Sequence, residues 1–480
     1  MRELLRETAD LAADYLESVP DRPVFPRIEP GQLRDRLGGA LPEGPTAPLD
    51  VVRDLAAAGS EGAIGISGGR YFGFVIGGAV PAALAADWLT STWDQNAGLY
   101  VCGPAAAIVE EITGVWLADL LRIPRAKSFA FVTGTQMAHA TAMAAARNHV
   151  LAEIGWDVEE KGLTGAPRIR VFAGEKAHST FPRALRLIGL GTGSITAIPA
   201  DEQGRMRGDA LREALAGWDG PTIVCAKAGE VNTGSFDPFV EIADAAEEAG
   251  AWLHVDGAFG LWAAVSPRFA HLVAGAERAD SWSTDGHKWL NVPYDCGIVL
   301  CARPEPHRRA TSVYADYLIH ADEGGPRDQM DWTPEFSRRA RGFTVYAAIR
   351  SLGRSGIAEL IERCCDHAAR FAAGIAEVPG VEVLNDVVLN QVLFRFDSDE
   401  RTAAALKAVQ DGGVAWMSGS TWNGRAAIRI SVSNWQTTTE DIDRTVAEFA
   451  PRPASPAASG AGPGSRPERT RSRRGRRVAG

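Results

Sequence analysis

Short apolar runs alternate with longer amphipathic stretches from Ser128 to Ala302, and this rhythm constrains the fold more than any other feature of the chain. Amphipathic segments such as 135–154 and 238–250 have helical spacing, whereas the apolar runs have the length of strands. This alternation predicts βαβ units on a mostly parallel sheet whose strands are buried on both faces. The predicted strands are SFAFV (128–132), RIRVFAG (168–174), SITAIP (194–199), PTIVCAKAG (221–229), AWLHVD (251–256), ADSWSTD (279–285) and CGIVLCA (296–302).

The segments on either side of this alternation have different patterns. The chain starts with an acidic amphipathic helix, MRELLRETADLAADYLESV, and a connector rich in Pro and Gly (20–48) leads to further helical patterns up to about Leu121. From about Met330 a long helical segment runs through Arg341 to Phe371. Strands VEVLND, NQVLFRF and AAIRISV then combine with two helices, the pattern of a smaller α+β domain.

The boundaries follow from these changes of pattern. We predict an N-terminal helical segment (1–95), a large α/β domain that holds the functional site (96–325), a C-terminal α+β domain (326–450) and a disordered Arg-rich tail (451–480).

The formal net charge of −10 is unevenly distributed. Residues 451–480 contain eight Arg and one Glu, and subtracting that +7 from −10 leaves −17 for the rest of the chain. An acidic body argues against nucleic acid as the main partner. Because the tail consists largely of Pro, Gly, Ser, Ala and Arg, we interpret it as disordered, with an arm that binds nucleic acid or acidic lipid as the alternative.

Cysteine usage and the apolar segments predict a cytoplasmic protein. The six Cys form no CxxC pair, which favours reduced thiols over a disulfide framework. The N-terminus lacks the apolar core of a signal peptide. The longest uncharged stretch, Tyr71 to Ala86, has 16 residues interrupted by Gly and Pro, which is too short to span a bilayer.

Two segments carry the strongest chemical signal, HVDGAFG (254–260) and TDGHKWLNVP (284–293). Asp256 ends one predicted strand and Lys288 follows the next, and ligands of open α/β sheets bind outside the carboxyl ends of strands. Alone, Lys288 would be interpreted as a solvated surface lysine. Together with Asp256 it matches pyridoxal 5′-phosphate (PLP), which needs an amine for a Schiff base and an anion that keeps its pyridine nitrogen protonated. The small side chain of Ala258 would let the cofactor ring lie flat.

A phosphate site is predicted where the first strand of the alternation meets the following helix, at Gly134, Thr135 and Gln136. Gly134 allows close backbone approach, and the free N–H groups and dipole at the helix start favour an anion. Thr135 also suits a helix N-cap, which is its structural alternative. His178 lies at another strand-to-helix turn, as a packed or capping residue or as an imidazole that covers the cofactor ring opposite Ala258 and assists proton transfer.

From about Tyr71 to Glu448 the chain resembles the group II PLP-dependent decarboxylases of fold type I, the aromatic-amino-acid and glutamate decarboxylase superfamily. The segments that carry the resemblance are RYFGFVIGG, TGTQMAHATAMAAAR, EKAHSTFPRAL, AGEVNTGSFDP, HVDGAFG, ADSWSTDGHKWLNVPYDCG and AIRISVSNWQTTTEDID. The resemblance implies an aspartate aminotransferase-like large domain with a mostly parallel seven-stranded sheet, together with the smaller C-terminal α+β domain.

The resemblance also implies roles for individual residues. Lys288, His178 and Asp256 would be catalytic, with Lys288 as the Schiff-base lysine and Asp256 as the partner of the pyridine nitrogen. Ala258 and His178 would flank the ring. The other cofactor contacts would come from Gly134, Thr135, Gln136 and His287 around the phosphate and from Thr233 near the cofactor edge. Family members are homodimers whose N-terminal helices wrap the partner, so the active site would lie at the subunit interface.

One departure from the family concerns proton delivery. A decarboxylase must protonate the substrate Cα, and in the family a Tyr on a mobile loop, a few residues ahead of a Trp, supplies this proton. The matching position in GGPRDQMDWTPEF is Gln329, which is not an acid. Tyr314 and Tyr317 lie upstream and are alternative donors. Otherwise the outcome differs, as oxidative deamination to an aldehyde, aldol-type cleavage or transamination.

Three smaller departures lie close to the predicted cofactor. Glu230 and Val231 stand where the family usually has Thr, and Asp285 stands where Asn is common beside the phosphate. An ionised carboxylate would be repelled by a phosphate dianion, so we expect Asp285 to point away or to pair with a cation.

The substrate is encoded less clearly than the cofactor. Tyr71, Phe72 and Phe74, with Trp93 nearby, match a region that lines the substrate pocket in relatives, and aromatic walls suit an aromatic or other apolar amino acid. The alternative is a hydrophobic patch that packs under the N-terminal segment. Arg429 resembles a position that meets a substrate carboxylate in some fold type I enzymes, and a structural salt bridge is the alternative.

We therefore predict a PLP-dependent carboxy-lyase that decarboxylates an L-amino acid, with an aromatic substrate favoured, through a Lys288 Schiff base and a quinonoid intermediate. The alternatives are a PLP-dependent aldehyde synthase, an aldol-type lyase, an aminotransferase or a catalytically silent PLP-binding protein. The expected partner is a second copy of the chain, and no metal is expected.

Overall fold

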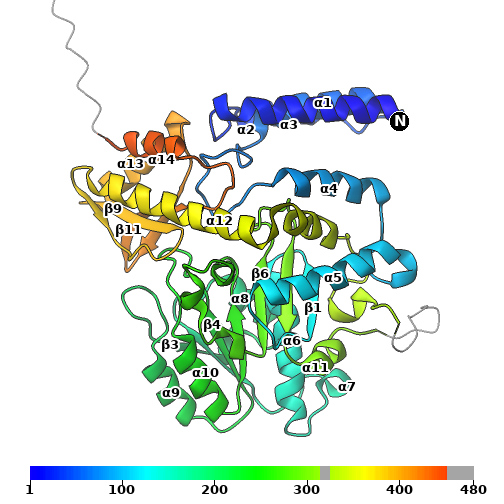
Figure 1. Cartoon of the computed structure of the whole chain (residues 1–480), viewed down its shortest axis with the longest axis vertical. Helices are drawn as coiled ribbons and strands as arrows, with labels where there is room; N and C mark the ends of the chain where they lie inside the picture. The colour runs from blue at the N-terminus through cyan, green and yellow to red at the C-terminus, as the bar shows by residue number, and fades with distance from the viewer. Residues whose placement is uncertain (314–324, 451–480) are drawn as a thin grey trace, which may run out of the picture.

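A seven-stranded sheet forms the centre of the computed structural model, which describes residues 1–313 and 325–450 (Figure 1). Its strand order is β1-β7-β6-β5-β4-β2-β3. β7 runs antiparallel to β1 and β6, and the other neighbours are parallel, which confirms the predicted mostly parallel sheet. The strands are β1 (Ser128–Val132), β2 (Arg170–Gly174), β3 (Ile195–Ile198), β4 (Thr222–Lys227), β5 (Trp252–Asp256), β6 (Ser281–Asp285) and β7 (Gly297–Cys301).

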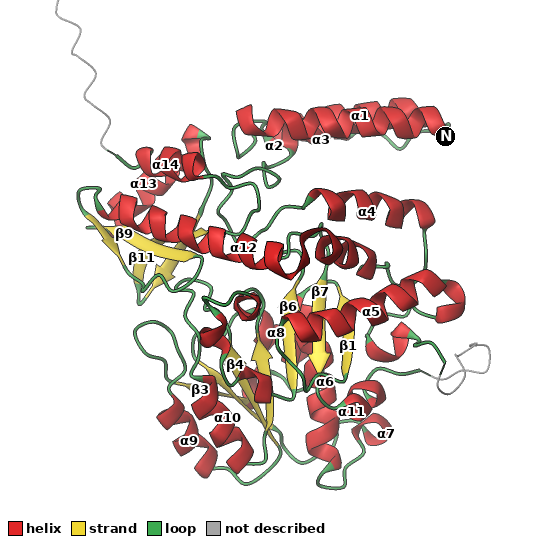
Figure 2. Ribbon diagram, in the orientation of Figure 1, coloured by secondary structure: helices red, strands yellow, loops and turns green. Residues whose placement is uncertain are grey.

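Helices cover both faces of this sheet (Figure 2). Strand side chains point alternately to the two faces, so the core divides into two hydrophobic clusters. In β1, Ala130 and Val132 belong to the cluster that contains α6, whereas Phe131 belongs to the opposite cluster. The helices around the sheet are α5 (Pro104–Leu120), α6 (Thr135–Ala152), α7 (Val158–Lys161), α8 (Thr180–Leu187), α9 (Gly208–Ala216), α10 (Phe239–Glu248) and α11 (Pro304–Arg309), with a 3₁₀ helix, η4 (Gly260–Val265).

The C-terminal part is an antiparallel sheet of order β10-β11-β9-β8, flanked by helices. The sequence predicted only three of its strands, because the segment that forms β10 carries no apolar alternation. The predicted long helix also begins later than expected, at Gly342, after the short 3₁₀ helix η7 (Gln329–Trp332) and an irregular stretch. The elements are α12 (Gly342–Ala376), β8 (Val381–Val383), β9 (Gln391–Phe396), α13 (Asp399–Gly412), β10 (Ser418–Trp422), β11 (Arg425–Ser431) and α14 (Thr439–Ala447).

The N-terminal helices form a layer outside this body. They are α1 (Arg2–Ser18), α2 (Pro30–Leu37) and α3 (Pro48–Gly62), followed by α4 (Pro81–Trp93). α1 packs against α3, and α4 packs along the long helix α12, so the layer stands above α12 (Figure 1). Neither α1 nor α2 has a buried residue.

The domain boundaries at 95, 325 and 450 remain predictions, and the Arg-rich tail (451–480) lies outside the described residues. Across 1–313 and 325–450, no helix combines the length and the apolar character needed to cross a bilayer.

Candidate active site

The carboxyl ends of β5 and β6 bring Asp256 and Lys288 to the same edge of the sheet. Asp256 is the last residue of β5 and pairs in register with Ser283 of β6. β6 ends at Asp285, and Lys288 follows three residues later. The two predicted site residues therefore lie on neighbouring strand ends, where open α/β sheets bind their ligands.

The Asp256 carboxylate is buried and is held from two sides. Its Oδ1 accepts a hydrogen bond from the Ala258 backbone N–H at 3.2 Å, and its Oδ2 lies 3.4 Å from His139 Nε2. Burial alone raises the pKa of Asp256, but His139, His178 and Lys288 outweigh burial, and the net pKa is lowered. Asp256 is therefore an anion at neutral pH, as a partner of a protonated pyridine nitrogen must be.

Lys288 forms an ion pair with Asp285, whose position departs from the family pattern. Lys288 Nζ lies 3.0 Å from Asp285 Oδ2, and His287 Nε2 lies 3.7 Å from Asp285 Oδ1. Burial raises the pKa of Asp285, but Lys288 and His287 lower it further than burial raises it. Of the two expectations for Asp285, the structure shows pairing with a cation. The same carboxylate also accepts the Thr135 backbone N–H at 2.7 Å.

The start of α6 has the features of an anion site. Its N-cap, Gly134, makes no side-chain capping bond, and the buried Thr135 Oγ1 has no hydrogen-bond partner among the described residues. A Cβ on Gly297 would lie 2.4 Å from the Gly134 backbone, so β7 and this turn can approach each other only because residue 297 is glycine. Gln136, the second residue of α6, is half-buried.

These groups together fit PLP. An amine, a buried carboxylate and a helix start with an unpartnered hydroxyl match the aldehyde, the pyridine nitrogen and the phosphate of the cofactor. Asp285 contacts Lys288, His287 and Thr135, and the Ala258 backbone connects it to Asp256, because the Ala258 N–H donates to Asp256 Oδ1. Ala258 lies two residues beyond Asp256, and its carbonyl accepts the Asp285 backbone N–H at 3.0 Å.

His178 follows β2 and is exposed beside this set of contacts. Its Nδ1 accepts the backbone N–H of Thr180 at 3.3 Å and lies 2.8 Å from the Thr180 hydroxyl. Surrounding protein still lowers the pKa of His178 by burial, and Lys288 lowers it further while Asp256 raises it. The neutral ring therefore carries its proton on Nε2, because Nδ1 is the acceptor of a backbone donor.

Thr233 is fully buried within the loop after β4. Its hydroxyl lies 2.7 Å from the Gln203 carbonyl and 3.0 Å from Ser235 Oγ. Glu230, one of the departures from the family, accepts the backbone N–H groups of Asn232 at 2.5 Å and Thr233 at 2.8 Å. Glu230 thus folds the loop onto itself, and no described contact joins Thr233 to Lys288 or Asp256.

Asn291 holds the Lys288 turn in place and was not predicted from the sequence. Its side-chain amide donates to the carbonyls of Trp289 and Ser433, and its backbone carbonyl accepts the Val80 N–H at 2.8 Å. The segment before Val80 also touches the turn, since a Cβ on Gly77 would lie 1.7 Å from the Lys288 carbonyl oxygen. Segment 71–80 is therefore packed directly on the turn that carries Lys288.

Tyr71 and Phe74 stack on Trp416, a residue that the sequence did not single out. The Tyr71 and Trp416 ring centroids lie 5.1 Å apart with an interplanar angle of 1°, and Phe74 lies 5.6 Å from Trp416. Phe74 is 59% exposed and leaves this aromatic surface open. Phe72, by contrast, is fully buried in the core. Trp93 packs edge-on against Phe343.

Gln329 and Arg429, two further positions considered from the sequence, contact other parts of the protein. Gln329 is buried in η7 and donates to the Ala107 carbonyl at 3.2 Å, so it packs against α5 and faces no described site residue. Arg429 contacts the Val231 carbonyl at 3.3 Å and the Ser418 hydroxyl at 3.2 Å. The alternative proton donors, Tyr314 and Tyr317, lie outside the described residues.

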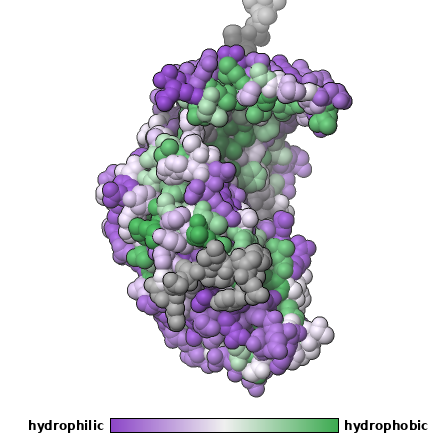
Figure 3. All heavy atoms as spheres, turned by 90° about the vertical axis from the view of Figure 1, so that its right-hand side faces the viewer, coloured by the Kyte–Doolittle hydropathy of each residue, from purple (hydrophilic) through white to green (hydrophobic). Residues whose placement is uncertain are grey.

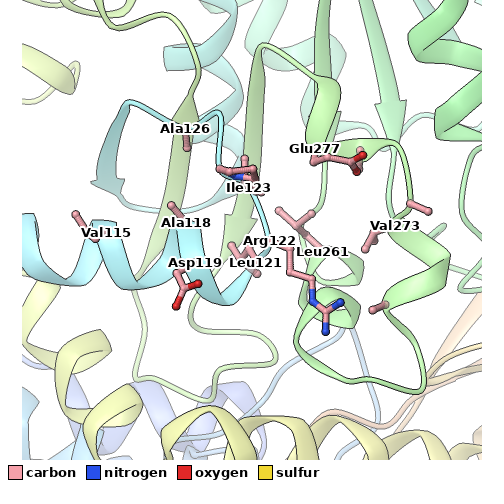
Figure 4. Close-up of a pocket in the computed structure, with 14 residues that line it drawn as sticks. Val115, Ala118, Asp119, Leu121, Arg122, Ile123, Ala126, Leu261, Val273 and Glu277 are labelled. Atoms are coloured by element: carbon pink, nitrogen blue, oxygen red, sulfur yellow. The ribbon is translucent and has the colours of Figure 1, made fainter.

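A hollow of about 710 Å³ lies elsewhere, between the end of α5 and the 3₁₀ turns that follow β5 (Figure 4). Apolar side chains such as Leu121, Leu261 and Val273 line most of it, with Arg122 and Glu277 among its charged residues. It contains none of the predicted site residues, so its size alone does not mark it as the reaction centre.

Comparison with known proteins gives one consistent result. The model of the pyridoxal-dependent decarboxylase conserved domain matches residues 30–397. Tryptophan decarboxylase 1 of Oryza sativa subsp. japonica is 30% identical over 90% of this chain and 90% of its own, and aromatic-L-amino-acid decarboxylase of Mus musculus is 28% identical over 81% and 84%. The crystal structure of Oryza sativa TDC with PLP and tryptamine superposes with a TM-score of 0.86 at 27% identity, covering 94% of this chain and 98% of that one. The predicted fold type I architecture is thereby confirmed.

Proposed function

Because the chain belongs to the pyridoxal-dependent decarboxylase family and is thus a PLP-dependent carboxy-lyase, we propose that it decarboxylates an L-amino acid with an aromatic side chain. Relatives whose names specify an aromatic substrate support this choice. The observation that carries it is the open stack of Tyr71, Phe74 and Trp416, because this stack belongs to the segment packed on the Lys288 turn.

We assign the cofactor contacts as follows. Lys288 holds PLP covalently through its amine, Asp256 faces the pyridine nitrogen, and Ala258 and His178 flank the ring. The phosphate is held at Gly134, Thr135, Gln136 and His287, and Thr233 shapes the loop at the cofactor edge. When bound, PLP supplies an electron sink for the electron pair that the departing carboxylate leaves behind.

Each of these side chains then has a defined task. Asp256, kept ionised, favours a proton on the pyridine nitrogen and so strengthens the electron sink. His178 presents a proton on Nε2 beside the site while its Nδ1 is held by Thr180. Asp285 orients the Lys288 amine through the ion pair between them, with Oδ2 lying 3.0 Å from Nζ.

The stack suits a flat aromatic side chain for a physical reason. Aromatic pairs at centroid distances of 4.5–7 Å gain about 0.5–1.5 kcal/mol beyond the burial of their area. A substrate ring that continues the stack on Phe74 would gain this contribution, and an aliphatic side chain of similar size would not. The aromatic surface therefore discriminates between substrates by shape as well as by polarity.

A screen of the twenty amino acids tests the proposal. The PLP-loaded enzyme should release CO₂ and the corresponding amine in equal amounts from Trp, Tyr or Phe, and at most slowly from Glu or Asp. Lys288→Ala should release neither and should lose the visible absorption of the bound cofactor. CO₂ release from an acidic amino acid alone would contradict the aromatic assignment.

A second outcome, in which O₂ is consumed and an aldehyde, CO₂, ammonia and peroxide are released, is favoured by one observation. Gln329 takes the position of the usual proton-donating Tyr, and its amide is engaged with Ala107. If Cα protonation fails for this reason, oxidative deamination, aldol-type cleavage or transamination would replace simple decarboxylation. Product analysis separates them, because only decarboxylation gives an amine and CO₂ without peroxide, glycine or a keto acid.

We also propose that the chain works as a homodimer in the cytoplasm. Large apolar side chains are exposed on the N-terminal helices, and hydrophobic surface gathers in the hollow beneath this layer (Figure 3). They include Leu5, Leu16, Val51, Leu55, Trp88, Leu89 and Trp93. All six cysteines are unpaired and five of them are buried, which suits a reducing compartment.

A further inference from the structure

Behind Asp256, two fully buried histidines form a line of close polar contacts, and His139 Nε2, which faces the carboxylate, has no hydrogen-bond partner among the described residues. His139 on α6 lies with its Nε2 3.4 Å from Asp256 Oδ2 and its Nδ1 3.0 Å from His254 Nε2. His254 on β5 continues the chain, because its Nδ1 lies 2.9 Å from Ser281 Oγ. The same hydroxyl accepts the indole N–H of Trp252 at 2.9 Å. None of these side chains belongs to the assigned cofactor contacts except Asp256.

The far end of the chain allows one direction. The Trp252 indole is only a donor, so Ser281 Oγ accepts there and its single hydrogen stays available for His254 Nδ1. His254 Nδ1 is then an acceptor, and the ring carries its proton on Nε2, directed at His139 Nδ1. By the same reasoning His139 carries its proton on Nε2, directed at Asp256.

The near end requires the same direction. If the chain ran the other way, His139 Nε2 would present a lone pair to the Asp256 carboxylate at 3.4 Å, and two acceptors would face each other in a site without solvent. Burial, followed by the influence of His139, lowers the pKa of His254 to about 3, so this ring is neutral at physiological pH. Ser283 Oγ lies 3.3 Å from His139 Nδ1 and 3.4 Å from His254 Nε2, at longer range than the contacts of the chain.

We propose that Trp252, Ser281, His254 and His139 form a directed hydrogen-bond relay that holds Asp256 as an anion and sets how strongly it attracts a proton to the pyridine nitrogen of PLP. The proposal rests on the proposed role of Asp256. His139 and His254 are positioning residues, because they act on the cofactor only through the Asp256 carboxylate. His139 contacts Oδ2 of Asp256, and the carboxylate keeps further lone pairs that can accept a hydrogen bond from the site side.

Groups from several elements surround the Asp256 carboxylate. His178 from the β2–α8 loop and Lys288 from the β6–β7 loop face the carboxylate on the site side, and Cys225 of β4 lies on the neighbouring strand. Lys288 is the residue that would hold the cofactor through its amine, so its own contacts would change when the cofactor binds. The relay donor from His139 is then a contact of Asp256 that does not change with the state of the lysine.

The test measures the protonation of the pyridine nitrogen directly. PLP labelled with ¹⁵N is bound to the holoenzyme, and the ¹⁵N chemical shift distinguishes a protonated from a neutral pyridine. In His139→Leu the shift should move toward the neutral value, and kcat should fall about 10- to 100-fold, the range of a lost hydrogen bond to a charged group. KM should change little. His139→Gln, which keeps a donor for Asp256, should retain most of the wild-type shift.

A second measurement keeps the proposal testable if His139→Leu does not fold. Ser281→Ala removes only the hydroxyl that orients His254, and it should give a smaller shift in the same direction. In protein with ¹⁵N-labelled histidine, both relay rings should show protonated Nε2 and unprotonated Nδ1. Finding His139 with its proton on Nδ1 would overturn the proposed direction.

Two control variants separate the possible failures. His307→Leu removes another fully buried histidine, one that contacts Ser128 and Trp332 instead of Asp256, and it should leave the pyridine shift unchanged. Asp256→Asn should abolish the protonated signal. If Asp256→Asn changes nothing, the proposed role of Asp256 is wrong. If Asp256→Asn acts and both His139→Leu and Ser281→Ala leave the shift unaltered, only the relay is wrong.

Discussion

His254 and His307 are fully buried imidazoles that resist protonation. His307 lies between Ser128 Oγ at 2.9 Å and the Trp332 carbonyl at 3.0 Å, and burial followed by Arg327 lowers its pKa to about 3, as for His254. The unfolded chain binds a proton at each His near its ordinary pKa of about 6.5. Between these values the unfolded state holds more protons, so stability falls as the pH falls from about 6.5 toward 3.

A variant can isolate this contribution. Each histidine adds up to about 1.4 kcal/mol of lost stability per pH unit in that window. His307→Gln should be less stable than the wild type at pH 7, yet its urea midpoint should fall less steeply between pH 6.5 and 4.5. Parallel midpoint curves for the two proteins would show that the His307 proton is not linked to unfolding.

The site residues that lie within a sequence motif could be predicted from the sequence. Residues that reach the site only because the fold brings distant segments together could not. Asp256 and Lys288 follow consecutive predicted strands, so their shared sheet edge could be inferred before the structure. Trp416 and Asn291 act across more than 100 residues of sequence, on Tyr71 and Ser433, and no local pattern marks such contacts. His139 lies within an Ala-rich helix, where a lone histidine has no recognisable partner in the sequence.

At the scale of elements, buried strands were predictable because their apolar runs are continuous. β10 was missed because it is an edge strand with the sequence SGSTW, although a turn signal was present. Asn423 and Gly424, both with positive φ, join Trp422 to its partner Arg425 as a two-residue hairpin. The irregular stretch ahead of α12 was misread as helical because its Arg side chains bind backbone carbonyls, as Arg338 does at Ala97 and Phe131.

The loop that precedes β10 offers the test of the aromatic stack. Trp416→Ala removes the ring shared by Tyr71 and Phe74, so KM for an aromatic substrate should rise about tenfold, equivalent to 1.4 kcal/mol, while kcat changes less. Trp156→Ala, at a partly exposed Trp near the far end of α6, is the matched control and should keep the wild-type KM. An unchanged KM in Trp416→Ala would separate the stack from substrate binding.

At the scale of the whole molecule, the exposed apolar surface of the N-terminal helices predicts a second copy. Trp88 is 42% exposed and Leu89 is 49% exposed on α4, and exposed apolar side chains that lie next to one another mark interaction surfaces. Sedimentation equilibrium of the wild type should give twice the mass of one chain. The double variant Trp88→Glu and Leu89→Glu should give the mass of one chain, and it should lose activity if the site lies at the subunit interface, as the family resemblance implies.

Ile154→Glu is the control for this experiment. Ile154 is 49% exposed at the end of α6, away from the N-terminal layer, and its substitution should leave the dimer intact. A wild type that sediments as a single chain while remaining active would refute the dimer. It would leave the assignment of the cofactor residues untouched.

α1 contains no buried residue, and this has a consequence for how firmly it is held. An isolated helix of 17 residues is only marginally stable in water. Because α1 rests on α3 without burying any side chain fully, little free energy opposes its detachment from the rest of the protein. Amide hydrogens of α1 should therefore exchange with solvent much sooner than those of the central sheet.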